Sequence, residues 1–209
     1  ACTLTVNQWI VGETAKAGTD IVSALESYRF NEAAHVGYRF AWNQFCDWYL
    51  EFTKPILQDG DAAAQSEVRA TTSWVLDQLL KFMQPIMPFV TQELWVQLAP
   101  PEGRSGLLML QSWPELGESL RFPNAEAEMG WVVRMVSEIR TVRSEMNVPP
   151  SADLPLTIIG ASDVTVARLN SHKGILARLG RLSNISVSDI VPAGAIQVVV
   201  DEATAALPI

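Results

Sequence analysis

The sequence predicts a mainly α protein, a helical bundle followed by a small α/β subdomain, and three features of the chain predict it. Apolar residues recur every three or four positions through most of residues 5–146, which is the spacing of amphipathic helices. The Pro149-Pro150 pair ends this pattern, because proline removes a backbone donor and restricts the residue before it. Short alternating segments, typical of strands, follow the pair. We therefore expect a helical domain over 1–150 and a small α/β domain over 151–209.

Two helices are expected at the start of the chain. Residues 5–28 carry one apolar stripe with Asn7 as a candidate N-cap, and residues 31–54 carry another with Asn31 as a candidate N-cap. The second helix is apolar around most of its girth, which suits the central helix of a bundle. Cys46 lies in this helix, where a small buried hydrophobe is the usual role. The residues expected to face the core are Phe30, Ala34, Tyr38, Ala41, Phe45, Trp48 and Phe52.

Three more helices are expected in the first domain, over about 65–84, 89–98 and 125–146, from the same periodicity. The stretch 99–106 is rich in proline and glycine and is expected to be a loop. Leu107–Gln111 is expected to form a short strand after it.

The second domain is expected to pack a helix on a sheet. The alternation of Leu154–Ile159, Ile185–Ser188 and Ala195–Val200 favours strands, and 163–180 favours a helix. The chain reaches Ile209 after a strand with no closing element, so we expect this subdomain to be truncated.

Composition excludes several classes of protein. At 48% hydrophobic residues the chain can form a core, and no apolar run approaches the roughly 20 residues that a membrane span needs. Cys2 and Cys46 form no CxxC pair, and with only His35 and His172 beside them no zinc-ligand spacing exists. A reducing, cytoplasmic compartment fits this cysteine usage. P-loop, GxGxxG, GxSxG, HExxH and EF-hand patterns are absent, so we expect no catalytic residue, no metal and no cofactor in this chain.

The charge of the chain limits how it can bind nucleic acid. The formal net charge is −8, with 15 basic residues scattered among 23 acidic ones. A free-standing RNA-binding domain usually shows a basic patch. Any contact with RNA must therefore be local, with the main phosphate contacts made elsewhere.

A polar ridge on the second helix carries the first candidate binding residues. Arginine and asparagine make bidentate contacts to base edges, and aspartate accepts a hydrogen bond from the amino group of cytosine. The alternative is a solvated ridge whose charge pairs only support the helix. The candidates, which share one helical face with Glu51, are Arg39, Asn43, Asp47 and Lys54.

Other candidates have equally open alternatives. Trp42 and Trp48 have rings that can stack on bases, but aromatic residues at helical spacing are more often core, and we expect both to be buried. Arg140 and Arg143 lie three residues apart on the 125–146 helix and are further candidates for binding RNA phosphate. For Arg143, which borders the apolar stripe, an ion pair with a carboxylate such as Glu93 is an equal alternative.

Several segments resemble the valyl-tRNA synthetases, a family of class I aminoacyl-tRNA synthetases. The sharpest is Phe45-Cys46-Asp47-Trp48-Tyr49-Leu50-Glu51, and isoleucyl and leucyl relatives resemble it less well. The resemblance extends over nearly the whole chain and is weakest over 151–209. It also rests on residues 28–34, on residues 84–95, and on residues 139–146 with Val148-Pro149-Pro150.

The resemblance implies an anticodon-binding helical bundle within a valine–tRNA ligase. Such a bundle would read the second and third anticodon bases of valine tRNA, adenine and cytosine, while the catalytic domain of the same chain uses ATP with magnesium. The motifs that resemble HIGH and KMSKS, the Rossmann fold and the editing domain are absent here, so this chain is expected to be non-catalytic. The Asn-x-x-Arg-Phe segment and the coiled-coil arm of the family are absent too, so weak binding of tRNA by this chain alone is expected.

Two alternatives stay open at this point. One is the corresponding anticodon-binding domain of an isoleucyl or leucyl synthetase. The other is a helical protein-interaction module without RNA binding, which the acidic balance favours. That module would expose a contiguous apolar patch of a few hundred Å².

Overall fold

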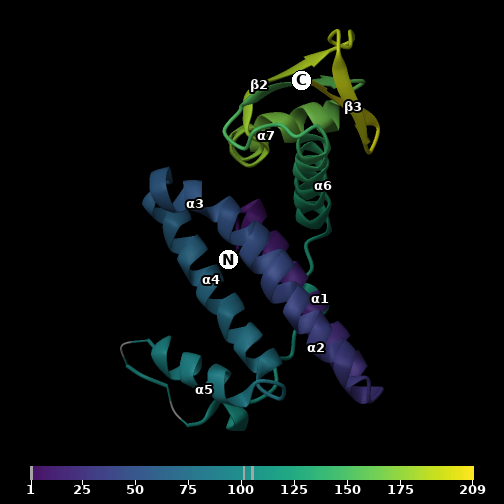
Figure 1. The fold of residues 1–209 in the computed structure, drawn as a ribbon. Coiled ribbons are helices and arrows are strands. Elements are labelled where there is room, and N and C mark those ends of the chain that lie inside the picture. The colour runs from purple at the N-terminus through teal and green to yellow at the C-terminus, as the bar shows by residue number, and fades with distance from the viewer. Residues whose placement is uncertain (1, 101, 105) are drawn as a thin grey trace. The chain divides into compact units, whose positions relative to one another are not determined.

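The computed structural model describes residues 2–100, 102–104 and 106–209, and the chain forms two compact units (Figure 1). The units are Ala1–Glu126 and Ala127–Ile209, and the division falls inside helix α6 (Pro123–Glu145). The domain boundary expected at residue 150 remains a prediction. Of the loop expected over 99–106, residues 101 and 105 lie outside the described residues.

The first unit is a bundle in which α1 packs against its sequence neighbours and against α4. The mainly α fold class, with a helical bundle before a small α/β part, is confirmed. Among the described residues, no helix combines the length and apolar character needed to span a membrane. The helices of the bundle are α1 (Thr5–Glu26), α2 (Phe30–Arg39), the π-helix η1 (Phe40–Tyr49), α3 (Leu50–Asp59), α4 (Ala62–Met83) and α5 (Pro88–Gln97).

A continuous helical rod made of α2, η1 and α3 replaces the single α-helix expected over 31–54. Its middle part is π-helical: the amide of Leu50 donates to the carbonyl of Phe45, five residues earlier. A π-helix holds about one more residue per turn than an α-helix, so the angle around the helix axis between successive side chains is smaller. The core-facing positions therefore include a five-residue step from Phe40 to Phe45. The buried residues of the rod are Ala33, Gly37, Phe40, Phe45, Tyr49, Phe52 and Thr53.

This change of phase corrects several expectations from the sequence. A regular three-to-four spacing traced backwards from Phe45 passes through Tyr38 and Phe30, but both are exposed. Cys46 and Trp42 were expected in the core and are exposed for the same reason. Trp48 is half-buried against Phe52, with ring centroids 5.7 Å apart.

The N-caps expected at Asn7 and Asn31 are wrong. Helix α1 begins after Leu4, and Glu67 of α4 accepts from the two amides just before the helix, Thr3 N at 3.0 Å and Leu4 N at 2.9 Å. Asn7 is buried one turn in, where it donates to Glu67 at 2.9 Å and accepts from the Tyr49 hydroxyl at 2.9 Å. A carboxylate from a distant helix thus holds the segment that leads into α1. Asn31 lies inside α2, whose N-cap residue is Arg29.

The strand expected at Leu107–Gln111 is wrong as well. The segment forms the 3₁₀ turn η2 (Leu108–Leu110), and the amide of Leu108 donates to the side chain of Gln92 at 2.8 Å. Leu108 is buried with Leu80 and Trp95, so it acts as a single apolar anchor. A second 3₁₀ turn, η3 (Glu118–Leu120), precedes α6.

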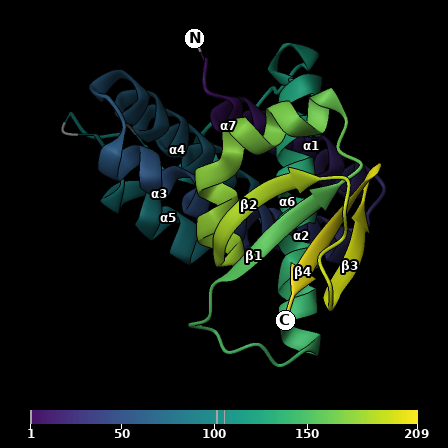
Figure 2. The same ribbon diagram turned by 90° about the horizontal axis from the view of Figure 1, so that it is seen from above.

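The second unit contains a four-stranded sheet with strand order β2-β1-β4-β3 (Figure 2). Strands β1 and β2 are parallel, and β4 is antiparallel to both β1 and β3. The expected strands and helix are confirmed, whereas β4 was missed, because its alanine-rich sequence lacks the β-branched alternation of a typical strand. The elements are β1 (Leu154–Ile159), α7 (Asp163–Gly180), β2 (Leu182–Ser188), β3 (Ala195–Val200) and β4 (Ala203–Pro208).

The hydrogen bonds that Glu67 accepts predict how acid affects the stability of the protein. Partial burial raises the pKa of Glu67, but hydrogen bonds from Thr3, Asn7 and Leu4 outweigh burial and bring the pKa to about 2. A carboxylate whose pKa falls on folding stabilises the protein above its unfolded value of 4.5, and this contribution is lost as the pH falls toward 2. We expect Glu67→Gln to lower the free energy of unfolding at pH 7 by about 1.5–3 kcal/mol.

Urea unfolding of the wild type and of Glu67→Gln between pH 3 and 7 measures this effect. The difference between the two proteins should shrink as the pH falls below 4.5. Glu26→Gln, at the exposed end of α1, should change the free energy of unfolding by less than about 0.5 kcal/mol. A difference between wild type and Glu67→Gln that does not vary with pH would contradict the prediction.

Candidate functional site

A polar hollow of about 270 Å³ lies between α1 and the rod formed by α2 and η1. Two of the candidate residues, Arg39 and Asn43, line it from the rod, and Gln44 lies beside them. The facing helix contributes three charged residues that the sequence did not single out, Glu13, Lys16 and Asp20. The sequence predicts a helix over 5–28 that can pack beside the ridge, but it does not predict which residues of that helix face Arg39 and Asn43.

Close packing of the rod fixes this side of the hollow. Phe40, which follows Arg39, is buried, so the exposed side chain of Arg39 is carried at the edge of the core. Gly37 lies where a Cβ atom would collide with the sulfur atom of Met83 and come within 3.8 Å of Ile21. The absence of a side chain at Gly37 therefore allows α2 to lie close to both α1 and α4.

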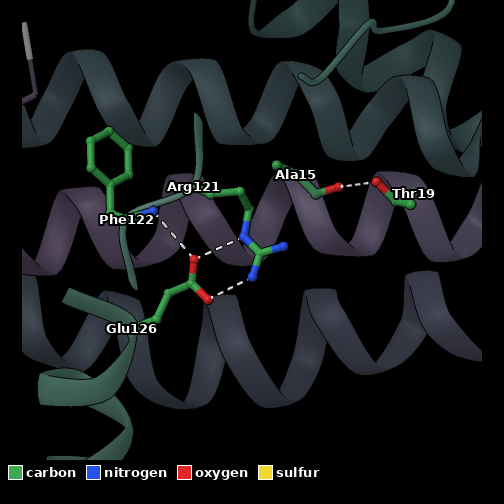
Figure 3. Close-up of polar contacts among 5 residues, drawn as sticks. All are labelled: Ala15, Thr19, Arg121, Phe122 and Glu126. Carbon is green, nitrogen blue, oxygen red and sulfur yellow. Dashed lines mark hydrogen bonds and ion pairs between the residues drawn. The ribbon is translucent and has the colours of Figure 1, made fainter. Parts of the chain in front are cut away.

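An ion pair between Arg121 and Glu126 packs against α1, the helix that forms the other side of the hollow (Figure 3). Arg121 donates to both carboxylate oxygens of Glu126, from Nε at 2.9 Å and from Nη2 at 3.0 Å, and the amide of Phe122 adds a contact at 3.3 Å. Hydrogen bonds from Arg121 lower the pKa of Glu126. The carboxylate lies against α1, since a Cβ atom on Gly12 would come within 2.8 Å of Glu126 Oε1.

The same ion pair affects the electrostatics of the hollow. Burial raises the pKa of Glu13, and Lys16 lowers it while the charge of Glu126 raises it further. One turn further along α1, Thr19 Oγ1 donates to the carbonyl oxygen of Ala15 at 3.1 Å, so this hydroxyl is bonded within its own helix (Figure 3).

The remaining candidates of the ridge lie outside the hollow. Asp47 is exposed on η1, and Lys54 forms an ion pair with Glu51 one turn earlier on α3. Exposed pairs of this kind stabilise a helix by about 0.3–0.5 kcal/mol, which is the supporting role considered as the alternative for the ridge.

Arg140 and Arg143 belong to the second unit, where both contact backbone carbonyl oxygens. Arg140 Nε donates to the carbonyl oxygen of Leu179 at 3.2 Å, in addition to its other interactions. Arg143 is only 8% exposed, and its Nη2 donates to the carbonyl oxygens of Pro149 at 3.1 Å and Ala152 at 2.7 Å. These bonds hold the Pro149-Pro150 turn and give Arg143 a structural role.

The chemistry of the hollow suits a planar polar group. Arg39 and Lys16 donate hydrogen bonds, Glu13 and Asp20 accept them, and the amide of Asn43 does both. A phosphate would meet the two carboxylates, which disfavour it by charge. The edge of a nucleobase, with neighbouring donors and acceptors, matches this mixture better. Within the described ranges, His, Cys, Asp and Glu side chains form no group of three or more that could bind a metal ion.

Comparison with known proteins adds a second line of argument. Residues 7–158 match the family model described as the anticodon-binding domain of tRNA ligase. The chain is 51% identical over 203 residues to the valine–tRNA ligase of Caulobacter vibrioides, covering 97% of this chain and 22% of that relative. It is 46% identical over 211 residues to the valine–tRNA ligase of Rhizobium meliloti, covering 100% and 22%, respectively. The chain thus spans 22% of the length of these curated relatives.

The contact at Gly12 generates a prediction. Gly12→Ala should push the flexible carboxylate end of Glu126 away from Arg121 and lower the free energy of unfolding by about 0.5–1 kcal/mol, because it weakens a partly exposed ion pair. Thermal and urea unfolding of the purified variant measure the loss.

Two further variants serve as controls for Gly12→Ala. Gly174→Ala in α7 has no atom within 4 Å of the new methyl group, so it should keep or raise stability through its better helix propensity. Combining Gly12→Ala with Glu126→Ala should cost less than the sum of the two, because the second change removes the clash. If Gly12→Ala stabilises the protein as Gly174→Ala does, the contact is not tight.

Proposed function

Because the chain belongs to the anticodon-binding domain family of tRNA ligases, we propose that it recognises the anticodon of valine tRNA within a valine–tRNA ligase. The valine specificity is supported by the names of the relatives that share about half of its residues. Valine activation, with ATP and magnesium, and transfer of valine to tRNA belong to the catalytic domain of the larger enzyme on this proposal. The enzyme would act in the cytoplasm.

One observation carries the proposal: Arg39 and Asn43 line one polar hollow together with the side chains of Glu13, Lys16 and Asp20 of α1. An unpaired anticodon base exposes its hydrogen-bonding edge, which is how single-stranded loops are recognised. Asparagine can bind the N6 and N7 edge of adenine, and a carboxylate can accept from the amino group of cytosine. The hollow holds both kinds of group, in Asn43 and in Glu13 or Asp20.

The acidic charge supports a role in discrimination rather than in overall affinity. Phosphate contacts dominate the affinity of proteins for nucleic acid, and a chain with a net charge of −8 supplies few of them. On this proposal the larger enzyme holds the tRNA, and this domain adds a few contacts to the bases. We propose Arg39 and Asn43 as the main ones, with Asp47, Lys54 and Arg140 as outer contacts.

A helical protein-interaction module is the second candidate function, and the surface of α5 and η2 favours it. These two elements pack against each other and expose several large apolar side chains, and Phe89 is 90% exposed. On that function Phe89→Ala, rather than a change in the hollow, would impair the protein. The exposed apolar residues of these elements are Phe89, Val90, Leu94, Val96, Met109 and Leu110.

The proposed function predicts that Asn43→Ala in the full-length ligase slows charging of valine tRNA. The expected loss in kcat/KM is about 5-fold to 150-fold, the equivalent of about 1–3 kcal/mol for a lost base contact. ATP–pyrophosphate exchange with valine should stay unchanged, because that step does not involve the anticodon. Arg39→Ala should act in the same way.

Two controls sharpen this test. A tRNA with a changed central anticodon base should show little difference between the wild type and Asn43→Ala, because the contact is already lost. Gln58→Ala, an exposed amide on α3 outside the hollow, should charge normally. Normal charging by both Arg39→Ala and Asn43→Ala would mean that the ridge is a solvated scaffold.

A further inference from the structure

Tyr38 and Trp42 form an exposed aromatic pair on the rod. They are 58% and 57% exposed, their ring planes lie within 4° of parallel, and their centroids are 6.5 Å apart. Phe40, Phe45 and Tyr49 of the same rod are buried, in contrast to this pair. The pair is therefore not part of the core, and two large flat rings with the same orientation lie open to solvent.

The pair adjoins the polar residues of the candidate site. Tyr38 precedes Arg39, and Trp42 precedes Asn43, so each ring is the sequence neighbour of a residue that lines the hollow. Phe40 and Gln44, which follow Arg39 and Asn43, line the hollow with them, whereas Tyr38 and Trp42 do not. The aromatic pair therefore lies beside the hollow, next to Arg39 and Asn43.

We propose that Tyr38 and Trp42 stack on an unpaired base of the anticodon loop, next to the base whose edge meets Arg39 and Asn43. This inference rests on the proposed function and adds the residues that bind a base by its face. Bases that are splayed out of a loop stack on aromatic side chains. Stacking needs no positive charge, so it gives an acidic domain a way to hold RNA.

Edge recognition and face stacking divide the work at this surface. Hydrogen bonds from Arg39 and Asn43 distinguish one base from another. Every base has a π face, so the aromatic pair tolerates any base and contributes affinity. The two groups are close enough on the rod to serve neighbouring nucleotides of one loop.

The test uses the full-length ligase and valine tRNAs in which one anticodon-loop nucleotide at a time is abasic. Trp42→Ala should weaken binding of the intact tRNA by about 5-fold to 150-fold, and Trp42→Phe should weaken it less, because a ring remains. One particular abasic tRNA should bind the wild type and Trp42→Ala almost equally, since the stacked base is already gone. Phe89→Ala, which removes a 90% exposed ring on α5, should bind every tRNA like the wild type.

Each other outcome overturns the inference in a distinguishable way. If Trp42→Ala and Tyr38→Ala bind all tRNAs normally while Asn43→Ala charges slowly, the stacking is wrong and the proposed function stands. An equal loss on every abasic tRNA means that the pair contacts something other than a base of this loop. If Asn43→Ala and Arg39→Ala also charge valine tRNA normally, the stacking and the proposed function are both wrong. Tyr38→Ala repeats the test at the second ring, so the question is still decided if Trp42→Ala folds poorly.

Discussion

The π-helical stretch η1 determines which side chains of the central rod face the core and which face outward. Its wider turn places Phe40 and Phe45 on the same buried side, although they are five residues apart. The hydroxyl of Tyr49 anchors the end of the stretch to Asn7 of α1, and burial raises the pKa of Tyr49 to about 12, so it remains a neutral donor. π-Helical segments are rare and occur frequently at functional sites.

The two walls of the hollow are held by different interactions. On the α1 side, Glu67 accepts from the amide of Leu4 just before the helix, while the pair between Arg121 and Glu126 packs against Gly12. On the side of the rod, close packing at Gly37 fixes the backbone next to the ridge. Groups carried by rigid helices in this way need little reordering when a ligand binds, which favours a site that discriminates by hydrogen bonding. On the proposed function, such a site adds specificity although the net charge of −8 opposes the binding of RNA.

Sequence periodicity and motifs predicted a large part of the fold. The helical bundle, the following strand–helix–strand unit and the polar ridge with Arg39 and Asn43 all depend on local spacing, which a single chain displays directly. The resemblance to valyl-tRNA synthetases also came from contiguous residues, such as the run from Phe45 to Glu51. The sequence therefore predicted one of the two walls of the candidate site, because that wall is a single helical face.

The features that the sequence did not predict depend on contacts between residues far apart in the chain. Glu67 holds the start of α1 through contacts with Thr3, Leu4 and Asn7 that span 60 to 64 residues, and no local pattern encodes them. Trp42 was exposed rather than buried, because tertiary packing selected a π-helix whose phase differs from the α-helical spacing read along the chain. The bonds of Arg143 to backbone carbonyls depend on where the chain turns after α6. The sequence by itself determined most of the helices and strands and which side chains form a polar ridge, but not β4 or the 3₁₀ turn at Leu108–Leu110. Only the tertiary structure decided which of those side chains share a hollow, because helix phase and burial depend on the packing of distant segments.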